Sequence, residues 1–507
     1  MGISEDLSEY KPLVLQNKKF FEDLLQKIKI ARNDREKLKL ARKAIKFATA
    51  TGTGYFSSDV LEQVFLDIAA KHVVKNLSAD FVSKSVLHVM TKAYFSGGHT
   101  RVVERWIEAS PDEEKHSLVL TSEAGQKLPP RLQKAVQSKG GKIIRFSNWW
   151  SDLRKGLELR KIASGYEFVV LHVHPEDVVP LIAFGNSQFK RPVIFYNHAD
   201  HKFWLGVGIA DLVADLRRKG QEITLKFRGA QNSFILGVPS ELSKPMVEKN
   251  KSEARRMLAL PQDKKIILTV GSAYKYKPLG KLDYLQVVQE LLKDENIIFV
   301  AIGPDYATLP LWKNVAEKNP GRLKVLGILP YGEVAAYIAA ADVVLDSFPM
   351  GGGTAMIDAV SQNRPVLFVD SILGQFDYLL GSVAQCSDFR DLAVRTRDLA
   401  YDEILQQNNV TEMKKRLADN CCMDVWKGRL PQVCHQAGQR HSLRSFKAVP
   451  KVSDDTVVLV NLYQKVKEKV WLRCGFWLQV RTVKEVYGKK LYVEFMGKTF
   501  LKLSCGG

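Results

Sequence analysis

The sequence predicts an α/β protein with two doubly wound domains, a helical region before them and a basic, β-rich tail after them. Apolar strand-like runs alternate with helical segments from residue 86 to 240, and a second such series covers residues 262–435. Such alternation is typical of a parallel sheet covered by helices on both faces. A proline-containing stretch separates the two series, and 507 residues exceed what one hydrophobic core holds.

The first domain, residues 86–240, carries five strand-like runs, at 86–95, 117–121, 142–146, 168–172 and 192–197. A glycine turn follows the first run, and a helical stretch at 101–109 follows the turn. Farther along, we interpret the segment with Asp211, Asp215, Arg217 and Arg218 as one helix. Its charges are either surface groups or acceptor contacts.

The second domain, residues 262–435, repeats the pattern. Strands are predicted at 265–271, 296–303, 323–327, 343–346 and 365–369, with helices at 284–292 and 333–341. Because ligands of such sheets bind at the carboxyl ends of the strands, the cleft between the domains is the expected site.

The two ends of the chain differ from this core. Residues 1–85 show apolar residues at helical spacing, and residues 440–507 contain three apolar, strand-like runs. The net charge of +20 is concentrated at both ends. It indicates either an ordinary solvated surface or attraction to an acidic partner such as an anionic membrane. Nucleic acid is not expected as a partner, because no nucleic-acid module accompanies the charge.

Composition narrows the class further. No apolar run reaches the roughly 18 residues of a membrane span, and the acidic start does not match a secretion signal, so a cytoplasmic protein is expected. Six cysteines do not make a disulfide scaffold, and their spacing predicts no metal site.

The stretch 342–358 carries the clearest chemical pattern. An apolar run ends at Asp346, three glycines and Thr354 follow, and a helix carrying Asp358 begins there. Glycines at a strand-to-helix turn let backbone N–H groups approach an anion, and the positive end of the helix dipole attracts it. The pattern predicts a phosphate or diphosphate site, with Asp358 placed to bind a ribose.

This loop is one of three features that resemble the nucleotide-binding domain of GT-B glycosyltransferases, most of all the O-GlcNAc transferase and bacterial asparagine-glucosyltransferase group. In residues 271–278, Lys275 matches that group's donor-binding lysine, and the backbone around Ile328 matches its uracil-contacting segment. The resemblance is good over residues 264–370 and loose over 86–235. It implies two Rossmann-like domains of the GT-B fold.

The resemblance also implies an activity. We expect transfer of a hexose from a nucleotide-sugar, a UDP-sugar, to a glycan or protein acceptor, without a metal or other cofactor. Such enzymes stabilise the departing diphosphate with a helix N-terminus and a cation. Lys275 is the candidate cation and Lys277 the reserve, the alternative being solvated loop charges. The residues expected to hold the rest of the donor are Gly352, Gly353, Thr354, Ala355 and Asp358.

One departure bears on stereochemistry. Retaining GT-B enzymes often carry a glutamate at the position of Met350 in this chain. Its absence favours inversion, in which the acceptor attacks the anomeric carbon from the face opposite the leaving group.

The first domain supplies the other candidates. Gly97, Gly98 and His99 resemble a glycine loop that faces the donor phosphate, with His99 placed to reach the acceptor or a phosphate. His198, Asp200 and His201 follow the run at 192–197, where two histidines and an aspartate indicate acid–base or substrate contacts. The alternative is that these side chains cap helices or face solvent.

Three other functions are weighed against a glycosyltransferase. A GT-B epimerase needs several carboxylates in the cleft, and the sequence offers few. A nucleic-acid- or carbohydrate-binding protein with the same fold would bind without transfer. An NAD-dependent oxidoreductase lacks support, because no G-x-G-x-x-G motif begins a helix with an acidic residue at the expected distance.

Overall fold

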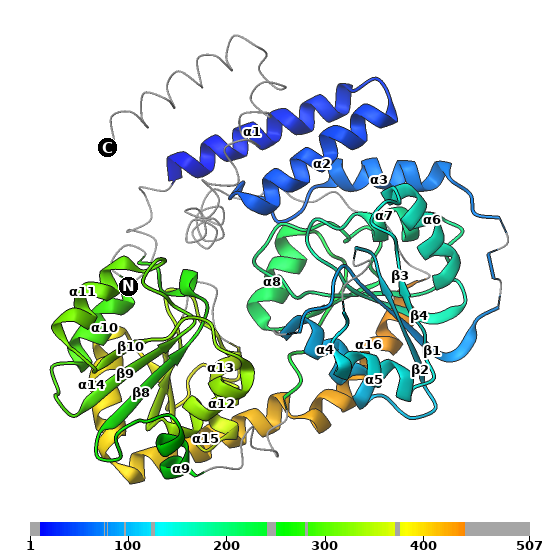
Figure 1. Ribbon diagram of the computed structural model, residues 1–507. Helices are drawn as coiled ribbons and strands as arrows, with labels where there is room; N and C mark the ends of the chain where they lie inside the picture. Colours follow the sequence, from blue (N-terminus) through cyan, green and yellow to red (C-terminus); the bar gives the residue numbers. More distant parts are fainter. Residues whose placement is uncertain are drawn as a thin grey trace.

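The computed structural model describes residues 11–441 except 76, 79, 96–97, 123–126, 241–249, 279–281 and 371–375. It shows two α/β domains with a group of helices above the first of them (Figure 1). The predicted basic tail at 440–507 and its strands therefore lie almost wholly outside the described residues. Among the described helices, none combines the length and the apolar character that crossing a membrane requires.

The first domain contains a seven-stranded parallel sheet in the order β3-β2-β1-β4-β5-β6-β7. Its strands are β1 (Val82–Met90), β2 (Lys115–Leu120), β3 (Ile143–Arg145), β4 (Tyr166–His172), β5 (Val193–Tyr196), β6 (Leu212–Asp215) and β7 (Ser233–Ile235). The connecting helices are α4 (Gly98–Ala109), α5 (Pro130–Ser138), α6 (Asp152–Ala163), α7 (Val179–Phe184) and α8 (Arg218–Phe227). The five predicted strands are all present, and the carboxyl ends of β1, β4 and β5 lead toward the cleft.

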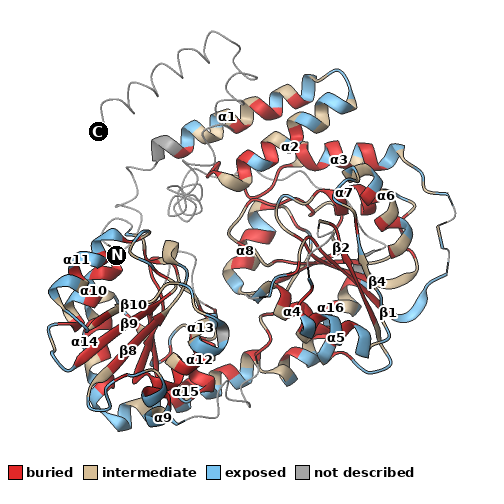
Figure 2. Ribbon diagram, viewed as in Figure 1, coloured by how far each residue is buried: buried red, intermediate tan, exposed pale blue. Residues whose placement is uncertain are grey.

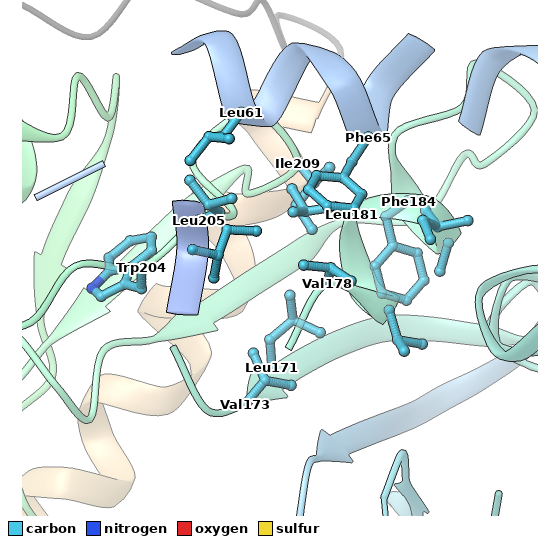
Figure 3. Packing of buried hydrophobic residues seen from close by; sticks show 14 of the residues in the cluster. Leu61, Phe65, Leu171, Val173, Val178, Leu181, Phe184, Trp204, Leu205 and Ile209 are labelled. Atoms are coloured by element: carbon cyan, nitrogen blue, oxygen red, sulfur yellow. The ribbon is translucent and has the colours of Figure 1, made fainter. Parts of the chain in front are cut away.

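Three N-terminal helices, α1 (Lys11–Ile30), α2 (Asp34–Ala50) and α3 (Asp59–Lys71), share a hydrophobic core with this sheet. Figure 3 shows Leu61 and Phe65 of α3 packed close to Leu181 and Ile209 of the first domain. The buried carboxylate of Glu62 also fixes this contact, because it accepts hydrogen bonds from the backbone N–H groups of residues 206–208. The helical region therefore belongs structurally to the first domain and supports the loop after β5.

The second domain has a six-stranded parallel sheet in the order β10-β9-β8-β11-β12-β13. Its strands are β8 (Lys265–Val270), β9 (Ile297–Ile302), β10 (Leu323–Val325), β11 (Val343–Leu345), β12 (Val366–Val369) and β13 (Gln385–Cys386). Its helices are α9 (Lys251–Met257), α10 (Tyr284–Leu291), α11 (Pro310–Lys318), α12 (Tyr331–Ala340), α13 (Thr354–Ser361), α14 (Phe389–Tyr401) and α15 (Glu403–Cys421). Buried strands with helices on either side (Figure 2) confirm the predicted fold class.

The last described helix, α16 (Met423–His441), returns to the first domain and runs below its sheet (Figure 1). Its Trp426 is fully buried against Trp106 of α4, with ring centroids 5.5 Å apart. The predicted domain boundary at residue 435 does not anticipate this crossing. A second link between the domains is the backbone N–H of Arg218, which donates to Asp377 over 2.5 Å.

Two local predictions are wrong. The segment from Asp211 to Arg218 is not one helix: β6 ends at Asp215 and α8 begins only at Arg218. The reason is tertiary, because buried Asp215 accepts hydrogen bonds from Asn197, Thr224 and Ser233, which hold it on the sheet. The first strand also ends earlier than predicted, at Met90 instead of residue 95.

Candidate functional site

A cavity of about 420 Å³ lies between the two domains, at the carboxyl ends of both sheets. This volume falls within the roughly 300–1,000 Å³ of small-molecule sites. Loops and helix ends of both domains line it, namely Gly98, His99, Val102, Tyr196, His198, Asp200, His201, Leu216, Arg217 and Val238 from the first domain and Tyr274, Lys275, Met350, Gly351, Gly352, Gly353, Thr354 and Phe376 from the second. The structure thus brings together nine of the predicted site residues.

The glycine loop after β11 forms one wall of this cavity. Its conformation needs glycine at position 353, where φ is +61° and an added Cβ would lie 2.6 Å from the Phe376 ring. The sequence predicted that the N–H groups of Gly352 and Gly353 would face a bound anion, but both are occupied within the loop. They lie 2.8 and 3.4 Å from the two carboxylate oxygens of buried Asp346, which is an anion supplied by the chain itself.

The N-terminus of α13 keeps other donors for a ligand. The N–H of Thr354 bonds to the Gly352 carbonyl. The N–H groups of Ala355 and Met356, by contrast, make no backbone hydrogen bond to any residue that the structure describes. Unpaired N–H groups in the first turn of a helix attract anions, and the helix dipole reinforces this attraction. The anion site predicted for this corner therefore moves from the glycines into the first turn of α13.

Lys275 lies beside the glycine loop that precedes this helix, in a short 3₁₀ turn (Ala273–Tyr276) that follows β8. Its Nζ donates to the Gly351 carbonyl over 3.3 Å. Burial lowers the pKa of Lys275, and nearby Arg217 lowers it further, whereas Asp346 raises it. A buried cation between a carboxylate and a second cation is well placed to bind an incoming anion.

Arg217 reaches the cavity from the other domain, at the start of α8. Its Nε and Nη2 contact the two carboxylate oxygens of Asp200 at 2.6 and 3.1 Å, a two-point ion pair. Burial works against the charged form of Asp200, yet Arg217 and His201 hold the pKa of this carboxyl far below its usual range. Asp200 therefore stays ionised, and this geometry favours a positioning role for it over the predicted acid–base role, which has not been tested.

The three candidate histidines all line the cavity, but their surroundings differ. His201 Nδ1 lies 3.2 Å from Asp200, and burial, against this partner, lowers its pKa to about 4. The His99 and His198 rings are in contact, with centroids 4.1 Å apart and their planes tilted by 50°. Burial and His174 lower the pKa of His99 to about 4, and burial, with the neighbouring histidines, also lowers that of His198. All three rings are neutral near pH 7, and a neutral imidazole can accept a proton.

Several predicted residues lie elsewhere. Lys277, Ile328, Ala355 and Asp358 do not line the cavity; Ile328 is 89% exposed, and Ala355 lies in the turn just described. Burial raises the pKa of Asp358, while Arg101 and Arg105, both on α4 of the first domain, lower it. Gly97 lies outside the described residues. The roles assigned to all these residues stay predictions.

Sequence reasoning missed three contributors. It placed Arg217 on a helix as a surface charge or an acceptor contact, gave Asp346 no role of its own in the site, and did not consider Phe376. An aspartate and, two residues later, an arginine directly follow a short apolar run at 212–214. This pattern could have predicted a cation at the end of a strand. No sequence signal indicates that Asp346 folds back onto its own glycines. In the part of the chain that the structure describes, no group of three or more metal-ligating side chains occurs.

No family model matches the sequence. TuaC of Bacillus subtilis, which is assigned to teichuronic acid biosynthesis as a glycosyltransferase, is 29% identical over 218 residues. The match covers 42% of this chain and 50% of TuaC, so the chain spans about half the length of this relative.

Solved structures resemble the chain over a larger part. A glycosyltransferase from Rickettsia africae gives a TM-score of 0.53 at 13% identity, covering 71% of this chain and 99% of that one. HepE from Anabaena, in complex with UDP and glucose, gives 0.54 at 12% identity, covering 69% and 99%. Identities this low establish the fold alone. The chain therefore has the GT-B fold, as the sequence resemblance implied.

Proposed function

We propose that this protein is a glycosyltransferase that moves a hexose from a UDP-sugar to a glycan or protein acceptor. The observation that carries the proposal is the pair of cations, Arg217 and Lys275, which approach one cavity from two domains beside the N-terminus of α13. The similarity to TuaC and the likeness to HepE with bound UDP support it.

The arrangement fits a diphosphate. A bound anion would stabilise the charged form of Lys275, which burial and the nearby Arg217 disfavour. Arginine carries five N–H donors, so Arg217 keeps donors for a phosphate beside its pair with Asp200. The N–H groups of Ala355 and Met356, which bond to no backbone carbonyl among the described residues, supply further donors. In this pose the sugar points toward His99 and His198, on the opposite wall.

The chemistry follows from this pose. When the bond between the anomeric carbon and the diphosphate breaks, its electron pair stays on the phosphate oxygen. Arg217, Lys275 and the helix N-terminus stabilise this growing charge, which is electrostatic catalysis by preorganised groups. The acceptor hydroxyl forms the new bond and loses its proton to a base, for which neutral His198 is our candidate. Because protein cations already face the leaving group, we propose that the reaction needs no metal.

We further propose that the transfer inverts the anomeric configuration. Met350 lines the cavity where retaining relatives often place a glutamate, and it is 96% buried within an apolar contact with Tyr274. The coupling constant of the anomeric proton in the transferred sugar, measured by proton NMR of the product, tests this step. An α-linked donor should give a β-linked product, and an α-linked product would reject inversion.

The donor class is tested by thermal shift with UDP-, GDP-, ADP- and CMP-sugars, followed by transfer assays with the sugar that stabilises most. A ligand that binds only the native state raises the melting temperature. We expect a selective rise with one or more UDP-sugars. Equal shifts with all four nucleotides would contradict a UDP site. Binding of a UDP-sugar with neither transfer nor hydrolysis would favour a binding protein on this fold.

Replacing Asp358 with asparagine tests the ribose role. We expect affinity for UDP to fall about tenfold, the effect of losing a hydrogen bond to a charged group. Calorimetry measures this directly, and Ser361→Ala, in the same helix, is the control, because its hydroxyl only bonds back to the Asp358 carbonyl. An unchanged affinity in Asp358→Asn would reject the ribose role.

A further inference from the structure

Four histidines form a continuous row through the first sheet. His116 is on β2, His88 on β1, His172 at the end of β4, and His198 just after β5, and these four strands are consecutive neighbours. His88 Nε2 lies 3.0 Å from His116 Nδ1, and His88 Nδ1 lies 3.2 Å from His172 Nε2. His172 Nδ1 lies 3.1 Å from His198 Nε2. Every neighbouring pair is within hydrogen-bond distance.

The row joins the cavity to the protein surface. At the cavity end, His198 lines the proposed donor site. At the other end, Glu114 Oε2 lies 3.3 Å from His116 Nε2. This distance is that of an ion pair, but the angle at His116 Nε2 does not meet the geometry of a hydrogen bond. The Glu114 side chain is 32% exposed, whereas those of His88, His116 and His172 are fully buried.

A purely structural role accounts poorly for this arrangement. The row lies in an otherwise apolar layer, beside Trp106 of α4, whose ring contacts both His88 and His172. Aliphatic side chains would fill this layer without the cost of burying polar groups. Hydrogen bonds between the histidines offset that cost here. They do so for every ring only if the series of bonds is unbroken from His116 to His198.

The row also restricts the tautomers. Burial lowers the pKa of His88, His172 and His198 well below the usual range, so these rings are neutral and each carries one N–H. The two bonds that join these three rings can then form in only two ways, with every proton on Nε2 or every proton on Nδ1. Glu114, 3.3 Å from His116 Nε2, favours the first arrangement, in which His116 Nδ1 accepts from Nε2–H of His88. His198 is then left with an unprotonated Nδ1, the nitrogen that the row does not use.

We propose that Glu114, His116, His88 and His172 form a proton relay that keeps Nδ1 of His198 as a hydrogen-bond acceptor in the cavity and takes up the proton of the acceptor hydroxyl. This inference rests on the proposed function, for which it assigns the destination of the proton. His198 is the catalytic residue of the set, since it alone lines the cavity, and the other four are positioning residues.

The proton balance is simple. The acceptor hydroxyl gives its proton to Nδ1 of His198, and the Nε2 proton of each imidazole moves to Nδ1 of the next. The last of these protons moves from His116 Nε2 to Glu114. The oxygen of the acceptor keeps the electron pair that forms the glycosidic bond. After product release, the reverse transfers return the proton to His198 and then to water in the open cavity.

The tautomers are measured by nitrogen NMR of the full chain labelled with ¹⁵N-histidine, because protonated and unprotonated ring nitrogens differ widely in shift. Assignment uses single His→Gln variants at positions 88, 116, 172 and 198. We expect Nε2 of all four rings to be protonated and Nδ1 of His198 to be unprotonated. A His198 ring protonated on Nδ1 in the resting protein would overturn the proposal.

A kinetic comparison tests the relay at its exposed end. Glu114→Lys replaces the carboxylate 3.3 Å from His116 Nε2 with a cation, whereas the neighbouring Glu113→Lys makes the same charge change at a side chain that pairs with Lys84. We expect kcat of Glu114→Lys to fall at least about tenfold, with the donor KM unchanged. We expect Glu113→Lys to behave as the wild type. Equal kcat values for the two variants would reject the relay.

The two proposals fail in different ways. Nε2-protonated rings in a protein that transfers no sugar would reject the proposed function and support the assigned tautomers. Sugar transfer by a protein whose His198 is protonated on Nδ1 would reject the relay and leave the proposed function standing.

Discussion

Replacing Lys275 with methionine is expected to lower kcat by roughly 10²–10³-fold, while donor affinity falls less. Methionine keeps much of the lysine stem, so the packing of this stem beside Gly271 is retained. The lost ammonium group faces Arg217 across the cavity and stabilises charge that appears only as the diphosphate leaves. The effect should therefore appear in kcat more than in ground-state binding.

The matched control is Lys277→Met, two residues farther along the same loop, which does not line the cavity. Steady-state kinetics with the donor found by thermal shift gives kcat and KM for both variants, and calorimetry gives UDP affinity. An equal loss of kcat and of binding in Lys275→Met would mean uniform binding of donor and transition state. Similar kinetics for the two variants would remove Lys275 from the proposed site.

Replacing Arg228 with methionine is expected to have the largest effect on stability. This guanidinium is fully buried and donates to the backbone carbonyls of Phe56, Asp200 and Lys202, with the Trp204 ring 4.2 Å from its central carbon. The variant leaves three buried carbonyls without these donors. We expect a loss of about 3 kcal/mol and a fall in melting temperature of roughly 10 °C.

Differential scanning calorimetry measures this change, and Lys226→Met, an exposed position on the same helix that pairs with Glu222, should shift the melting temperature little. Because two of the carbonyls flank His201, the loop carrying Asp200 and His201 should also loosen. Equal melting temperatures for the two variants would contradict the structural role of Arg228.

Most of the fold could be predicted because its strands are long apolar runs that local pattern identifies. Residues 168–172 and 297–302, for example, are buried on both faces and read as strands without tertiary information. β6 was missed, since three apolar residues between Asp211 and Asp215 fit a helical turn equally well. The strand is stabilised by hydrogen bonds that Asp215 accepts from Asn197, Thr224 and Ser233, and the local sequence does not reveal these bonds.

The candidate site was predictable to a similar extent. Lys275 and the glycine loop are recognised because motif and local geometry coincide at the end of a strand. The role of Arg217 depends on Asp200, its partner from another loop, and the capture of glycine N–H groups depends on how Asp346 folds back. The histidine row is invisible in sequence, because His88, His116, His172 and His198 meet only through the order of the strands.

The most direct test of the account is a crystal structure of the full chain with UDP. The account predicts the diphosphate between Arg217 and Lys275, with at least one phosphate oxygen within hydrogen-bond distance of the backbone N–H of Ala355 or Met356. A diphosphate bound outside the cavity between the domains, or inside it without contact to either cation, would contradict it.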